Sequence, residues 1–165
     1  AQLFMLDECS VGGLAISTEN VGVIYGVVGL ITLSAGGILG GILISRDGLK
    51  KWMLPMMLSL NVPNVLYAIM AMTQTKSLAF VVGTVAFEQF GYGFGFAAFL
   101  MYLIYIAEGA SKTSHYAIAT GFMALGAMLP GMISGAVQKW LGYDGFFIWV
   151  VLSALPAFFL LKYLK

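Results

Sequence analysis

The sequence has very little charge. Of its 165 residues, 8 are Lys or Arg and 7 are Asp or Glu, so charged side chains make up 9% of the chain. A soluble domain carries about 25% charged residues, and a soluble protein of this size would have too few polar side chains to cover its surface. The net charge of +1 offers nothing to a phosphate backbone. The composition therefore argues against a soluble globular, a disordered or a nucleic-acid-binding protein.

Cysteine and histidine are scarce as well. Cys9 and His115 each stand alone in the chain, which excludes an intrachain disulfide framework, a Cys-based zinc cluster and a His-rich metal site. The metalloprotease pattern H-E-x-x-H and the hydrolase pattern G-x-S-x-G are both absent from the sequence. We therefore expect no enzyme activity, no metal and no cofactor.

What the sequence has instead is long apolar runs. Apolar residues make up 61% of the chain, and about 20 of them suffice for a helix to cross the bilayer. The runs are continuous rather than alternating, which favours helices over a β-barrel. We predict an all-α polytopic membrane protein with five spans, at about 20–45, 52–74, 77–107, 114–139 and 145–163.

Residues 1–19 precede the first predicted span. The apolar stretch 1–6 ends at Asp7 and Glu8 and resembles the tail of a further helix, so we expect this chain to be the C-terminal piece of a larger protein. Cytoplasmic loops of membrane proteins are enriched in Lys and Arg. Alternating spans then place most cations on the cytoplasmic side: Arg46, Lys50, Lys51, Lys112, Lys162 and Lys165. Only Lys76 and Lys139 fall on the opposite side, together with residues 1–19.

Glu88 is the sharpest candidate for a functional residue. It lies about 16 Å along the third predicted span, close to the bilayer centre, where a carboxylate is expensive and faces a cavity, a partner or a proton path. A structural hydrogen bond between helices is the alternative. Other polar residues of the spans are candidates for the lining of a cavity: Asn61, Asn64, Gln89 and Tyr92. Asn61 and Asn64 share a helix face by their spacing, and both could equally join helices by hydrogen bonds.

Three glycines alternate directly after Glu88, at positions 91, 93 and 95. Each weakens the helix by about 1 kcal/mol relative to Ala. Either the helix bends at this point, or a neighbouring backbone or a ligand approaches it closely.

The segment from Gly41 to Lys51 resembles the signature loop of major facilitator superfamily transporters, G-x-x-x-D-R-x-G-R-R-R. It departs from that pattern at Ser45, where the family has Asp. The matching residues, with the nearby carboxylate, form the expected conformational signature loop: Gly41, Arg46, Asp47, Gly48, Lys50 and Lys51. In the superfamily this loop joins the second and third helices of each six-helix half. The resemblance therefore implies that the five spans correspond to helices 8–12.

A narrower resemblance covers most of the remaining chain. The stretch 87–99 carries a Glu, then glycines, then Ala-Ala-Phe, and is similar to the tenth helix of the muropeptide permeases, the AmpG-like family. Residues 113–117 are similar to that family's Ser/Thr-x-Gln-Tyr/Phe-Ala, with His115 in place of the Gln, and the segment 130–135 continues the pattern.

This resemblance implies a permease of the bacterial inner membrane that imports anhydromuropeptides from cell-wall turnover, driven by protons. Glu88 is then the proton-coupling or substrate site. The implied partners are the lipid bilayer, the N-terminal six-helix half of the same permease, a small polar solute and protons, with no nucleic acid. Two alternatives stay open: an acetyl-CoA-transporter-like permease, and a non-transporting scaffold or sensor built from half a permease.

Overall fold

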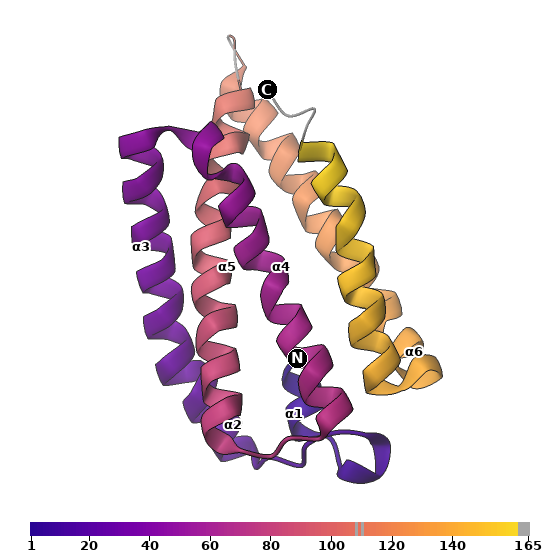
Figure 1. Cartoon of the computed structure of the whole chain (residues 1–165). Coiled ribbons are helices and arrows are strands. Elements are labelled where there is room, and N and C mark those ends of the chain that lie inside the picture. The colour runs from indigo at the N-terminus through magenta and orange to yellow at the C-terminus, as the bar shows by residue number, and fades with distance from the viewer. Residues whose placement is uncertain (108, 110, 162–165) are drawn as a thin grey trace.

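The computed structural model of the chain describes residues 1–107, 109 and 111–161. All regular structure in these residues is helical (Figure 1). The elements in chain order are α1 (Gln2–Leu6), η1 (Cys9–Val11), α2 (Thr18–Val23), η2 (Ile24–Gly29), α3 (Leu30–Asp47), α4 (Leu49–Thr73), α5 (Leu78–Ile106) and α6 (Lys112–Leu161). The predicted all-α architecture is confirmed.

The first long helix is built from three consecutive elements. The side chain of Ser17 accepts a hydrogen bond from the backbone N–H of Asn20 and caps α2. The chain then passes through η2, a π-helical turn, and continues as α3 to Asp47. A π-helical turn inserts one extra residue into an α-helix and is frequently found at functional sites.

Gly48 separates α3 from α4 with backbone angles of φ 84° and ψ 153°. Side chains other than glycine rarely adopt a positive φ, so this residue permits the reversal between the two helices. The turn lies inside the predicted signature loop.

The three alternating glycines of α5 are explained by packing on both sides. A Cβ atom at Gly93 would overlap the carbonyl oxygen of Leu33 in α3. A Cβ atom at Gly91 would overlap the carbonyl oxygen of Ser59 in α4, and Gly95 faces α4 in the same way. Figure 1 shows α5 between α3 and α4. The glycines therefore bring three helix backbones into close contact, as small residues do in membrane bundles.

The chain reverses direction within α6. Gly142 has non-helical angles of φ 69° and ψ 176°, and joins two helical segments. Figure 1 shows the second segment, in yellow, running back beside the first. The predicted spans at 114–139 and 145–163 lie on the two sides of this break. The end of the predicted span 145–163, from Lys162 on, lies outside the described residues, as does Lys165.

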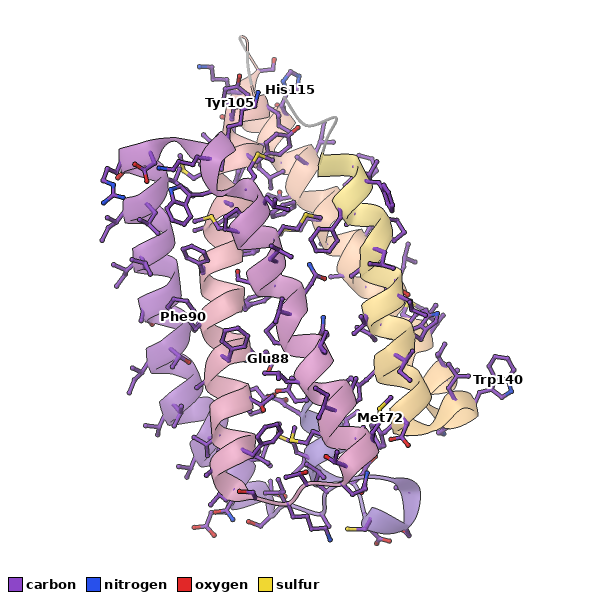
Figure 2. The ribbon with its side chains drawn as sticks, in the orientation of Figure 1. Met72, Glu88, Phe90, Tyr105, His115 and Trp140 are labelled. Atoms are coloured by element: carbon purple, nitrogen blue, oxygen red, sulfur yellow. The ribbon has the colours of Figure 1, made fainter. Side chains whose placement is uncertain are left out.

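Within the described residues, four helices are long and apolar enough to cross a membrane: Thr18–Asp47, Leu49–Thr73, Leu78–Ile106 and Lys112–Leu160. The last contains the break at Gly142, so it holds two of the five predicted spans. Large apolar side chains stand outward on these helices, for example Met132 at 77% and Trp140 at 85% exposure. Figure 2 shows the Trp140 side chain pointing away from the bundle. Such a surface suits hydrocarbon as solvent, and the chain is a multi-pass membrane protein.

Candidate functional site

Glu88 forms hydrogen bonds with two tyrosines from other helices. The hydroxyl of Tyr67 donates to Oε2 of Glu88 at 2.5 Å, and the hydroxyl of Tyr25 donates to the same oxygen at 3.1 Å. The two hydroxyl oxygens lie 3.2 Å apart. One carboxylate oxygen in α5 therefore holds together η2, α4 and α5.

Local structure sets the position of each tyrosine. Tyr25 belongs to the π-helical turn η2, and a π-turn rotates the following residues relative to a regular α-helix. Tyr67 lies in α4 with 1% of its surface exposed, and its ring stacks on Phe147 of α6 at a centroid distance of 5.6 Å. Packing thus fixes the ring of Tyr67 while its hydroxyl reaches Glu88.

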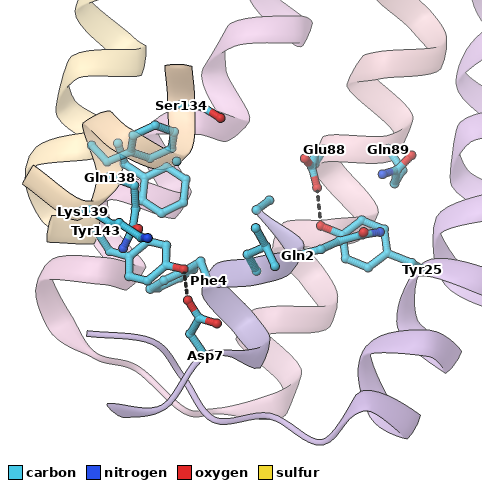
Figure 3. A pocket seen from close by; sticks show the side chains of 15 residues that line it. Gln2, Phe4, Asp7, Tyr25, Glu88, Gln89, Ser134, Gln138, Lys139 and Tyr143 are labelled. Atoms are coloured by element: carbon cyan, nitrogen blue, oxygen red, sulfur yellow. Dashed lines mark hydrogen bonds between the residues drawn. The ribbon is translucent and has the colours of Figure 1, made fainter. Parts of the chain in front are cut away.

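Beside Glu88 lies an open cavity of about 630 Å³ (Figure 3). Its polar lining comes from different parts of the fold: Gln2, Asp7, Tyr25, Glu88, Gln89, Ser134, Gln138, Lys139 and Tyr143. Figure 3 shows Glu88 and Gln89 on one side of the cavity and Gln138 and Lys139 on the other. The size suits a small solute, and both carboxylate and ammonium groups face it.

The rest of the cavity lining is apolar and consists of Ala1, Leu3, Phe4, Gly135, Phe146 and Phe147. Phe4 packs against Tyr143 and Phe147 at centroid distances of 5.0 and 5.2 Å. The hydroxyl of Tyr143 donates a hydrogen bond of 2.5 Å to Oδ2 of Asp7. This bond connects the segment after α1 to α6 next to its break at Gly142.

The other predicted cavity residues are not all brought together. Gln89 lines the same cavity as Glu88. Tyr92 is 51% exposed and stacks on Phe96 of its own helix. Tyr92 does not line the cavity at Glu88, although residues 88 and 92 are one turn apart.

Asn61 lines a second cavity of about 410 Å³, which is nearly all apolar and includes Tyr102. Its Nδ2 atom donates to the carbonyl oxygen of Met57 in the same helix, at 2.8 Å. Asn64 is half-buried and lines neither cavity. The structure therefore separates both asparagines from Glu88.

In the signature loop, Asp47 is the acceptor at the centre. It accepts from Arg46 Nε and Nη2 at 3.2 and 3.1 Å, and from the Trp52 indole at 3.0 Å. Lys51 Nζ lies 3.3 Å from Oδ2 of Asp47. Ser45, which stands where the family pattern has Asp, bonds only the carbonyl oxygen of Ile42 in its own helix. Gly41 and Lys50 form no such contact in the described part of the chain.

Sequence reasoning missed the role of the tyrosines. From the sequence, Tyr67 is interpreted as a packing residue, and nothing singles out Tyr25. The hydrophobic periodicity predicts neither the π-helical turn that carries Tyr25 nor which face of α4 meets α5. Among the described residues, no three His, Cys, Asp or Glu side chains lie close enough to hold a metal ion.

Comparison with known proteins shows distant relatives. The anhydromuropeptide permease of Escherichia coli K12 is 26% identical over 149 residues, which cover 90% of this chain and 30% of the relative. AmpG 4 of Rickettsia conorii and AmpG 3 of Rickettsia prowazekii, both described as transporters, are each 25% identical; they cover 92% and 82% of this chain. This chain spans about a third of the length of these relatives.

No family model matches the chain, and no solved structure matches it. The relatives and the motifs indicate the same family, and the matched region includes nearly all of the chain. The resemblance to the AmpG-like permeases that the motifs indicate is therefore confirmed, over about 90% of the chain.

Proposed function

We propose that this chain is part of a secondary transporter that carries anhydromuropeptide across the bacterial inner membrane, with Glu88 as the proton-coupling residue. The observation that carries the proposal is the Glu88 carboxylate inside α5, bonded by Tyr25 and Tyr67 at the edge of an open cavity. The names of the relatives support the choice of solute, since one is called an anhydromuropeptide permease.

The hydrogen bonds at Glu88 supply a way to link a proton to helix position. An ionised carboxylate only accepts, so both tyrosine hydroxyls can direct their protons to it. A protonated carboxyl group donates through its own O–H, and one tyrosine hydroxyl can then turn to the other, 3.2 Å away. Binding or release of a proton at Glu88 therefore changes the hydrogen bonds that connect η2, α4 and α5.

The proposed transporter needs more than this chain. Transporters of this architecture build their substrate site at the interface of two related halves near the bilayer midplane. The cavity at Glu88 is open on one side in this chain, and the relatives are about three times as long. We propose that an N-terminal half completes the cavity.

Asp47 is proposed to control the arrangement of the loop between α3 and α4. It gathers Arg46, Lys51 and Trp52 around one carboxylate. This role replaces that of the Asp which the family pattern places at position 45.

Uptake by the full-length protein in proteoliposomes tests the proposal. Labelled anhydromuropeptide should accumulate when a proton gradient is directed inward, and should only equilibrate without it. Labelled acetyl-CoA serves as the second probe. Uptake of acetyl-CoA alone would favour the acetyl-CoA-transporter-like alternative. Uptake of neither solute by folded protein would contradict transport and favour a scaffold or sensor.

A further inference from the structure

Lys139 stands out by its place in the charge distribution. Most cations of the chain fall on the predicted cytoplasmic side, and Lys139 and Lys76 are the exceptions. The ammonium group of Lys76 lies 2.9 Å from Sγ of Cys9 at an exposed position. Lys139 instead lines the cavity that contains Glu88.

Lys139 belongs to a polar wall on the first segment of α6. Ser134 and Gln138 lie on the same wall, and Figure 3 shows Gln138 and Lys139 across the cavity from Glu88 and Gln89. The hydroxyl of Ser134 bonds the carbonyl oxygen of Gly131 in its own helix. The amide of Gln138 and the ammonium of Lys139 are therefore the groups of this wall that can donate to a solute.

Neither carboxylate of the cavity forms an ion pair with Lys139. Asp7 accepts from the Tyr143 hydroxyl, and Glu88 accepts from Tyr25 and Tyr67. Within the described residues, the Lys139 ammonium forms no ion pair or hydrogen bond. A cation that faces a cavity and has no partner among the described residues can bind an anionic group of a ligand.

We propose that Lys139 binds a carboxylate of the transported solute and makes the transporter selective for acidic solutes. The inference rests on the proposed transport function and deepens it. Glutamine amides on both sides of the cavity suit the amide groups of a peptide, and the rings of Phe146 and Phe147 suit its apolar faces. The Lys139 ammonium supplies the charge that discriminates between an acid and its neutral analogue.

The test uses the full-length transporter in proteoliposomes with two labelled probes: an anhydromuropeptide and the same compound with its carboxyl groups converted to amides. The wild type should have the lower KM for the acid. In Lys139→Gln the KM for the acid should rise about tenfold, the cost of one lost charge-assisted hydrogen bond. The KM for the amide should stay unchanged, and Lys139→Arg should restore most of the preference. Lys76→Gln is the matched control, because it removes the other cation on the same predicted side.

A KM for the acid within about twofold of wild type in Lys139→Gln would overturn the inference, and so would an equal rise for acid and amide. Lys139 is exposed, so the variant should fold, and Lys139→Met gives a second neutral variant if it does not. Transport of neither probe by the wild type would overturn the transport function and this inference together. If the wild type transports the acid and Lys139→Gln has the same KM values as the wild type, this inference alone is overturned.

Discussion

The hydroxyl of Tyr67 donates a hydrogen bond of 2.5 Å to Oε2 of Glu88 and ties α4 to α5 at that carboxylate. The ring that carries this hydroxyl is 1% exposed and stacked on Phe147. Its position is therefore set by packing and not by the hydrogen bond itself.

Tyr67→Phe should lower proton-driven uptake by about tenfold to a hundredfold, the range in which a displaced reacting group reduces rates. The ring stays in place in this variant and only the donor is lost. Initial rates of uptake by the full-length protein check the prediction. Tyr102→Phe is the control, since Tyr102 lines the separate apolar cavity. Equal rates for Tyr67→Phe and wild type would show that the tyrosine has no part in coupling.

Gly93→Ala should lower the free energy of unfolding by about 1–3 kcal/mol, the usual cost of overpacking. The new Cβ atom would overlap the carbonyl oxygen of Leu33 and push α3 from α5. Thermal unfolding in detergent measures the effect. Gly83→Ala in the same helix is the control, because a Cβ atom there has no neighbour within 4 Å. An unchanged melting temperature in Gly93→Ala would contradict the close packing.

The glycines of α5 show which features of the fold can be predicted from the sequence and which cannot. Their alternating spacing predicts either a bend or a close approach, and only the fold reveals that α5 packs on two neighbours at once. In the same way, the scarcity of charge and the length of the apolar runs predict the all-α membrane fold. Periodicity gives no tertiary contacts, and so it could not join Tyr25 to Glu88.

Asn61 and Asn64 illustrate a second limit. Their spacing predicts a shared helix face, but not which neighbour that face meets. In the structure Asn61 bonds its own helix and borders an apolar cavity. Glu88 was identifiable because a carboxylate inside an apolar run is costly wherever it points, whereas an amide there can be satisfied locally.

The bond between Tyr143 and Asp7 should contribute to stability. Tyr143 is 5% exposed and donates to a carboxylate, and hydrogen bonds to charged groups are worth about 1.5–3 kcal/mol. Tyr143→Phe and Asp7→Asn should each be destabilising, and the double variant should cost clearly less than the sum of both. The free energies of unfolding of the wild type, the two single variants and the double variant give the coupling energy between the two side chains. Additive effects would mean that the two side chains act independently.

Cys9 reports the orientation of the chain in the membrane. It is exposed and contacts Lys76, on the side opposite the cation-rich loop. With any other cysteines of the full-length protein removed, a membrane-impermeant maleimide should label Cys9 in intact spheroplasts. Ser45→Cys, with Cys9 replaced by Ser, should react only in inverted vesicles. The reverse pattern would contradict the orientation inferred from Lys and Arg.

The proton-coupling role of Glu88 is tested most directly by uptake in the Glu88→Gln variant of the full-length protein. Glutamine keeps the size of the side chain but cannot take up or release a proton near neutral pH. We expect loss of the accumulation driven by an inward proton gradient, with exchange of labelled for unlabelled solute retained. Glu19→Gln, a carboxylate at the exposed start of α2, should behave as wild type. Gradient-driven accumulation by Glu88→Gln equal to wild type would contradict the proton-coupling role of Glu88.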